Sequence, residues 1–163
     1  MPERTPLGRC ATVLAAALVV PLLGGCSLFG DDDEAAGVSV FSIKPGQCFE
    51  GQTEVKAQQS ELPEVECAED HAQESYAVIE YQADSGDQAG DTYPGDDALA
   101  KFANGACAGE YGKYVGVDYL DSELFYTYLL PSARSWEDDD RSVICFVTSA
   151  GEPLQGSVKG SKR

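Results

Sequence analysis

The six cysteines of this 163-residue chain are the feature that most restricts its fold. They contain no Cys-x-x-Cys pair, and their spacings are long and irregular: Cys10, Cys26, Cys48, Cys67, Cys107 and Cys145. A structural zinc site draws its ligands from closely spaced pairs, so zinc explains this pattern poorly. Disulfides are the other common use of cysteine, and they persist outside the reducing cytoplasm. The compartment of the protein therefore has to be inferred first.

The N-terminal segment indicates export followed by lipid attachment. Residues 1–9 are weakly basic, and residues 11–23 form an apolar run. This run is shorter than the roughly 20 residues that a helix needs to span a bilayer. It closes on Leu23-Gly24-Gly25-Cys26, where two small residues would admit a peptidase to the backbone just before a cysteine.

We interpret residues 1–25 as a lipoprotein signal peptide and Cys26 as the lipidation site. Two acyl chains of the palmitate type on one residue anchor a protein stably, whereas one chain binds only marginally. The segment thus predicts a protein anchored by lipid to the outer face of the cell membrane.

The charge of the chain is strongly acidic. The full sequence carries a net charge of −17, and cleavage before Cys26 would make it about −18, because residues 1–25 carry one net positive charge. Such a surface disfavours nucleic acid and anionic lipid headgroups as direct partners. The simplest consequence of the charge is solubility.

Composition divides the expected mature chain into three parts. Residues 26–37, with the acidic run at 31–34, predict a solvated tether, because neighbouring like charges disfavour compaction. Residues 38–155 predict the folded domain. Residues 156–163 predict a flexible tail, and the Gly-, Ser- and Lys-rich stretch from 151 onward is expected to fray.

Periodicity in the domain predicts an α+β fold. Residues 38–43, 75–82, 124–130 and 142–148 have the β-branched and aromatic content of strands, with a Pro-Gly turn within 44–47 and a polar loop at 132–141. In 75–82 strict alternation would set Tyr76, Val78 and Glu80 on one face. We expect a small, mostly antiparallel sheet packed against one main helix.

Residues 94–115 predict that helix. Pro94 suits a first turn, and Asp96 and Asp97 suit the positive end of the helix dipole. Apolar residues recur with helical spacing and make one face: Leu99, Phe102, Ala103, Ala106, Cys107, Tyr111 and Tyr114.

Four cysteines remain for disulfides once Cys10 and Cys26 are set aside, and four allow three connectivities. We expect Cys48 to pair with Cys67, because short strands flank the loop between them. We expect Cys107 to pair with Cys145, because Cys107 lies on the apolar face of the helix and Cys145 alternates with Val143 and Val147. Both thiols of the second pair should then point inward.

The order of several short motifs resembles the septum-formation domain family. The motifs are Pro45-Gly46-Gln47-Cys48-Phe49, Val65-Glu66-Cys67, His71, Glu74-Ser75-Tyr76, Tyr93-Pro94-Gly95, Cys107, Pro131, Ser135-Trp136 and Asp140-Arg141-Ser142-Val143-Ile144-Cys145. The resemblance covers roughly residues 41–155. The family usually has Pro directly before the histidine, where this chain has Asp70. It usually has Gly before Asp-Arg, where this chain has Asp139. The resemblance implies a role in the cell envelope of high-GC Gram-positive bacteria, linked to division, and supplies no catalytic residues.

Individual candidate chemistries are weakly supported by the sequence. His71 is the only histidine, so His71 and Glu74 lack the second histidine of a helical zinc-protease motif, and we expect neither metal nor cofactor. A hydrolase would need His71 as its histidine base, yet no Gly-x-Ser-x-Gly is present. The acidic run 138–140 could bind calcium, but a solvated loop tip is the simpler interpretation.

A partner contact is the remaining candidate site. Trp136 stands in a polar loop beside Arg141, and loops often carry binding residues. Tyr126 and Tyr128 could join such a patch, although core packing is the simpler interpretation for both.

The sequence as a whole predicts a non-enzymatic envelope lipoprotein that binds another envelope or division protein. The alternative is a cell-wall ligand-binding protein or hydrolase. A concave site with acidic and aromatic side chains would favour the alternative, whereas a convex surface over a filled core would favour the interaction module.

Overall fold

The computed structural model describes residues 37–51, 60–82 and 92–163, all within one compact unit, Asp33–Arg163. The predicted signal peptide, the lipidation site Cys26 and all of the predicted tether except Gly37 lie outside the described residues. Among the described residues, no helix has both the length and the apolar character needed to cross a membrane.

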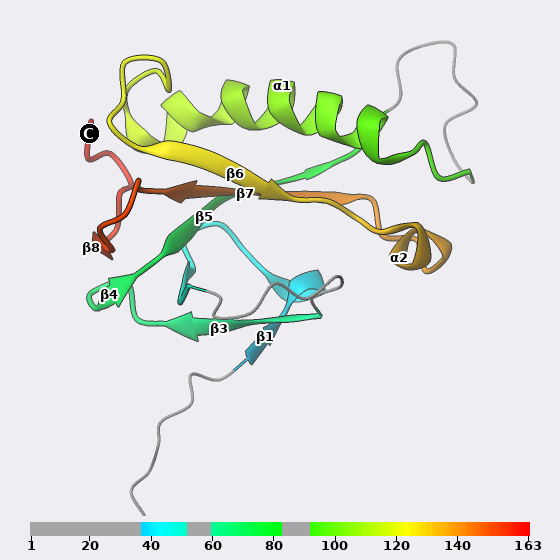
Figure 1. Cartoon of the computed structure of the whole chain (residues 1–163), viewed down its shortest axis with the longest axis horizontal. Coiled ribbons are helices and arrows are strands. Elements are labelled where there is room, and N and C mark those ends of the chain that lie inside the picture. Colours follow the sequence, from blue (N-terminus) through cyan, green and yellow to red (C-terminus); the bar gives the residue numbers. More distant parts are fainter. Residues whose placement is uncertain (1–36, 52–59, 83–91) are drawn as a thin grey trace, which may run out of the picture. The chain divides into compact units, whose positions relative to one another are not determined.

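The described chain forms an antiparallel six-stranded sheet with one long helix (Figure 1). The strand order across the sheet is β1 (Gly37–Ser39), β3 (Glu61–Val65), β2 (Cys48–Phe49), β5 (Gln73–Glu80), β7 (Ser142–Thr148) and β6 (Phe125–Leu129). A second, two-stranded sheet pairs β4 (Asp70–His71) with β8 (Leu154–Gln155). The helices are η1 (Val40–Ser42), which is a 3-10 turn, α1 (Asp96–Val115) and α2 (Ala133–Glu137). The predicted fold class is confirmed.

The strand β7, which lies between β5 and β6, divides the core into two parts, because successive side chains of a strand point to opposite faces. Val143, Cys145 and Val147 face α1 and join its buried residues in the larger cluster. Ile144 and Phe146 face the other side, where they pack with residues of the first strands and turns: Ile43, Phe49 and Leu62. Figure 1 shows this division, with α1 along one side of β6 and β7 and with β1 and β3 on the other.

One disulfide stabilises each part of the fold. Cys107 of α1 is joined to Cys145 of β7, and both residues are fully buried. Cys48 of β2 is joined to Cys67, just after β3. Both predicted pairings are confirmed. Closing loops of these lengths contributes about 4 and about 3 kcal/mol respectively on the chain-entropy account.

A β-bulge in β5 changes the face that the sequence assigned to Tyr76. Ser75 pairs with Phe146 and Ala77 pairs with Cys145, so Tyr76 is the extra residue. Tyr76 therefore points to the helix side, where its hydroxyl donates to the carbonyl of Cys107 at 2.8 Å. Strict alternation had grouped Tyr76 with Val78 and Glu80, and that grouping is wrong because a bulge shifts the phase by one residue.

Glycines fix both ends of α1. The helix begins at Asp96 rather than at the predicted Pro94, because Gly95 has a φ of 93° that no helical residue adopts. It ends at Gly116, which has a φ of 91° and donates its N–H to the Gly112 carbonyl, a left-handed C-cap. Gly116 thus terminates the helix directly after Val115.

The expectation of a fraying C-terminal segment is wrong. Val158 is buried, and the N–H groups of Gly160 and Lys162 donate to the carbonyls of Tyr114 and Val115 at 2.8 and 2.9 Å. Those two carbonyls belong to the last turn of α1 and have no partner within the helix. Glycine-rich composition suggested mobility, but these turns let the backbone reach and cap the helix end.

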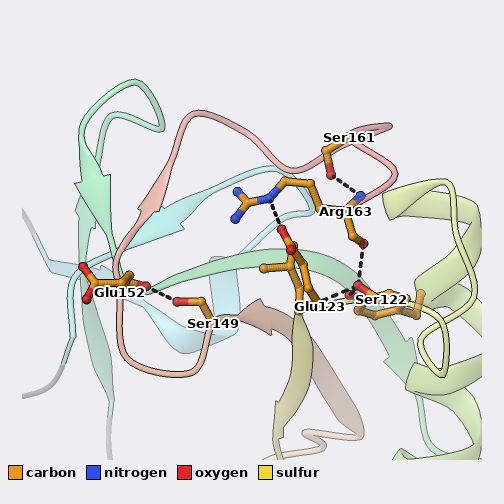
Figure 2. Close-up of polar contacts among 8 residues, drawn as sticks. Ser122, Glu123, Ser149, Glu152, Ser161 and Arg163 are labelled. Carbon is orange, nitrogen blue, oxygen red and sulfur yellow. Dashed lines mark hydrogen bonds and ion pairs between the residues drawn. The ribbon is translucent and has the colours of Figure 1, made fainter.

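Side-chain hydrogen bonds also hold the end of the C-terminal segment and the turn before β8. Figure 2 shows the Arg163 guanidinium bonding Glu123 at 3.0 Å, and the Ser122 hydroxyl donating to the Arg163 carbonyl at 2.5 Å. In the same view the Ser149 hydroxyl donates to the carbonyl of Glu152 in the turn before β8. Residues 156–163 are therefore part of the domain.

Two further segments differ from the sequence prediction. The strand predicted for 38–43 is interrupted, since β1 ends at Ser39 and η1 follows. The loop predicted for 132–141 contains α2, which begins with a capping box: the Ser135 N–H donates to the Ser132 hydroxyl, and the Ser132 N–H donates to the Ser135 hydroxyl. The sequence gives little sign of α2, because a capping box with serine at both positions lacks the usual Glu or Gln. A helix of five residues is also too short to show a helical period.

Candidate functional site

A groove lies on the side of the sheet that faces away from α1. Its volume is about 510 Å³. The apolar lining comes from η1, from the end of β6 and from β7: Val40, Phe41, Leu129, Leu130 and Ile144. The polar lining comes from the residue before β3 and from the α2 region: Ser60, Ser132, Arg134, Ser135, Asp138, Asp140 and Ser142. Apolar and polar groups that converge in one concavity are typical of binding sites.

Two aromatic residues on this side of the sheet are exposed. Phe41, in the groove lining, is 65% exposed, and Phe125, in β6 but outside the groove lining, is 55% exposed. Phe125 lies on the same face of β6 as Leu129, because residues four apart in a strand share a face. Large apolar side chains left in solvent at the edge of a concave surface are characteristic of interaction sites.

Trp136 and Arg141, the predicted partner contacts, lie together but do not form an exposed patch. Trp136 is only 4% exposed and contacts the rings of Tyr81 and Tyr93 edge-on. The Arg141 guanidinium carbon stacks 3.8 Å from the centre of the Trp136 ring, and its Nη1 donates to the Trp136 carbonyl at 2.8 Å. The indole ring is therefore not available to a partner in this conformation. The physical reason is that Trp136 belongs to α2, a helix that the sequence prediction lacked, and packs against Tyr81, Tyr93 and Arg141.

The acidic run after α2 has a structural role in the backbone. Asp138 follows the helix as its C-cap, and Asp139 has a φ of 63°, which closes the turn. The Asp140 carboxylate accepts the N–H of Ser142 at 3.0 Å, at the start of β7. The turn leaves Glu137, Asp138 and Asp139 in solvent, next to the groove.

Tyr126 and Tyr128 pack on the helix side, as their default interpretation predicted. Both are partly buried against the larger cluster, and their hydroxyls contact Asn104 of α1. They form no part of the groove lining.

The most buried charged side chain is Glu74 of β5, with no exposed surface. One of its oxygens accepts hydrogen bonds from the Tyr114 and Ser157 hydroxyls at 2.5 and 2.6 Å, and the other accepts the N–H of Val158 at 2.7 Å. A buried carboxylate needs such a set of donors. Burial and the bond to Glu74 raise the pKa of the Tyr114 hydroxyl well above its ordinary value. Glu74 thus joins the sheet, α1 and the C-terminal segment.

His71 is buried in β4. Its Nδ1 donates to the Glu69 carbonyl at 2.8 Å, which leaves Nε2 as an acceptor. Nε2 is buried without a hydrogen-bond partner among the described residues. A general base must be within reach of a substrate proton, and this nitrogen is buried.

Ligand atoms of Cys48, His71 and Glu74 lie within 4.8 Å of one another, which is the spacing of a metal site. The chemistry of the donor set does not fit a metal, however. Cys48 is bonded to Cys67 and offers no thiolate, and both Glu74 oxygens already accept hydrogen bonds. The cluster functions as a packed polar core in the oxidised protein.

The groove is the functional feature that sequence reasoning missed. Its residues come from η1 and, far along the chain, from the consecutive elements β6, α2 and β7, and two of these elements, η1 and α2, were not predicted. The only available signal was Phe41, an aromatic residue directly before a serine and a turn, and it was interpreted as part of a strand.

The fold and these features define a small, disulfide-stabilised α+β domain with a groove on its helix-free side. Residues 42–161, most of the chain, match the family described as Septum formation. The chain therefore belongs to the septum-formation family, which associates it with septum formation. No curated protein and no solved structure matches the chain.

Proposed function

We propose that this protein is a non-enzymatic, lipid-anchored envelope protein whose domain binds another envelope protein during septum formation. Family membership supports the link to the septum. The Leu23-Gly24-Gly25-Cys26 sequence supports attachment to the outer face of the cell membrane through Cys26. The observation that carries the binding role is the groove, which has the exposed Phe41 in its lining.

Two observations favour binding over catalysis. The only histidine of the chain is buried at 2% exposure. The four cysteines of the domain are paired in two disulfides, so none is available as a nucleophile.

A second candidate is binding of a cell-wall ligand, and the concavity of the groove favours it. Asp138, Asp140 and Phe41 line the same hollow, which is the combination expected of a ligand site. The protein partner is preferred because the groove adjoins an edge of the sheet, where a peptide backbone can bind.

The test is to capture membrane proteins with the full, acylated chain. It compares two variants, each of which replaces one exposed apolar residue. Phe41→Ser removes the groove wall, and Leu120→Ser removes a side chain that is 77% exposed but lies outside the groove lining. We expect Phe41→Ser to lose a specific partner that Leu120→Ser retains. Equal capture by both variants, together with binding of soluble wall fragments that depends on Phe41, would support the second candidate instead.

A further inference from the structure

The strand β6 is an open edge of the six-stranded sheet. It pairs with β7 over Phe125–Leu129 and stands last in the strand order. No backbone hydrogen bond joins its outer side to another described segment of the chain. The outward N–H and C=O groups of an edge strand are ready to pair with another chain.

Residues 125–129 lack the devices that usually protect such an edge. The sequence Phe-Tyr-Thr-Tyr-Leu contains no charge, no proline and no glycine, and its register with β7 runs without a bulge. The opposite edge, β1, is only three residues long. Proteins normally blunt an edge with lysine, proline, a bulge or short length. An unprotected edge of five residues therefore points to a pairing role.

The groove continues from the end of this edge. Leu129 and Leu130 line it, and Phe125 and Leu129 point to the same helix-free side. A strand added beside β6 would place alternate side chains on that side. Its apolar residues would meet Phe125, and those near its end would enter the groove against Ile144 and Phe41.

Charge selects the kind of strand that fits. The α2 turn presents exposed Glu137, Asp138 and Asp139 next to the groove, on a chain whose net charge is −17. Arg134 is the only basic residue among the described residues of the lining, and the Arg141 guanidinium contacts the Trp136 ring and carbonyl. A second copy of this chain would bring the same negative charge to the edge, whereas a basic segment would be attracted.

We propose that a basic, extended segment of a partner protein adds as a strand to β6 and places its apolar side chains in the groove. This inference rests on the proposed function, since it names the chemistry of the partner that the interaction module would bind. Backbone pairing supplies affinity in this mode, and the pockets for alternate side chains supply specificity.

The test uses a synthetic peptide of alternating Lys and Val as the probe, titrated against the full chain in detergent. Two further peptides serve as comparisons: one with Glu in place of Lys, and one N-methylated along both backbone edges. We expect the Lys peptide to bind at least about tenfold more tightly than either. N-methylation keeps the charge and the side chains of the peptide but removes the backbone N–H donors that a β-strand needs, so equal binding of the methylated peptide would overturn strand addition.

Matched charge variants locate the site. The double variant Glu137→Lys/Asp138→Lys reverses two charges beside the groove, and Glu66→Lys/Glu69→Lys reverses two exposed charges near β4. Thermal unfolding checks that both variants are folded. We expect the first variant to bind the Lys peptide at least about tenfold more weakly and the second to bind it like the wild type. Equal weakening would show attraction to overall charge alone and would overturn the proposal.

Two further measurements separate this inference from the proposed function. Concentration-dependent dimerisation in sedimentation that excludes the Lys peptide would assign the edge to a second copy and overturn the proposal. If the peptide fails to bind while membrane capture still depends on Phe41, strand addition to β6 is refuted and the proposed function stands. If neither peptide binding nor Phe41-dependent membrane capture is observed, the proposed function as an interaction module is refuted as well.

Discussion

The two sides of the sheet differ in how completely their side chains are closed off from solvent. The helix side holds a disulfide between fully buried cysteines, a bulge that turns Tyr76 inward and a capped helix end. The other side holds a smaller cluster, a groove of about 510 Å³ and an exposed Phe41. The difference indicates that stability depends mainly on the helix side, and it leaves the other side as the one proposed to bind a partner.

The largest expected effect is loss of the disulfide that joins α1 to β7. Replacing Cys107 and Cys145 with Ala should lower the free energy of unfolding by about 4 kcal/mol, and replacing Cys48 and Cys67 by about 3 kcal/mol, because the first closes the longer loop. Chemical denaturation of both variants measures the difference, after non-reducing peptide mapping has verified the pairing in the parent. A larger loss from the Cys48–Cys67 pair would reverse the contrast between the two sides.

Glu74→Gln should destabilise the domain by about 2 kcal/mol, in the range of hydrogen bonds to a charged group. Gln presents an amide N–H₂ where the structure has donors from Tyr114, Ser157 and Val158. Glu66→Gln, at an exposed position, is the matched control and should change stability by less than about 0.5 kcal/mol. Equal unfolding midpoints for the two variants would show that Glu74 does not join the C-terminal segment to the sheet.

Alkaline pH should weaken the helix side selectively. Burial, followed by the charges of Tyr126 and Tyr111, raises the pKa of the Tyr76 hydroxyl well above 10.0, its ordinary value. The folded state then holds a proton that the unfolded state releases above about pH 10, so stability is complete below that pH and falls as pH rises further.

The phenylalanine variant isolates that contribution. Tyr76→Phe should make the alkaline decline shallower by about one proton in the linkage slope. Denaturation at a series of pH values, with tyrosinate absorbance followed in parallel, measures it. An unchanged slope would mean that the Tyr76 hydroxyl titrates alike in both states.

The smallest expected effect on stability is at the groove. Phe41→Ser should change the free energy of unfolding by less than about 0.5 kcal/mol, because the ring is mostly in solvent. Thermal unfolding of the variant and the parent tests this. A loss of several kcal/mol would place Phe41 in the core and remove the distinction between the two sides.

The sequence predicted the helix side well, because the spacing of apolar residues and the positions of the cysteines both indicate which side chains are buried. The face of α1 with Leu99, Cys107 and Tyr111 was evident from spacing, and Cys145 from its alternation in β7. Tyr76 was assigned wrongly because a bulge leaves no mark in an alternating pattern.

The helix-free side could not be predicted, because it depends on short elements. η1 and α2 are three and five residues long, too short for any period, and they assemble the groove from distant segments. The C-terminal segment was misjudged for a related reason. Its glycine-rich composition resembles a linker, while its role depends on where the carbonyls of Tyr114 and Val115 lie.

Membrane capture measured together with unfolding, for Phe41→Ser and Glu74→Gln, tests the separation of binding from stability most directly. The account predicts that Phe41→Ser loses the partner at unchanged stability. It also predicts that Glu74→Gln, assayed at a temperature where it is folded, keeps the partner despite lower stability. Loss of the partner in folded Glu74→Gln with full retention in Phe41→Ser would contradict the account.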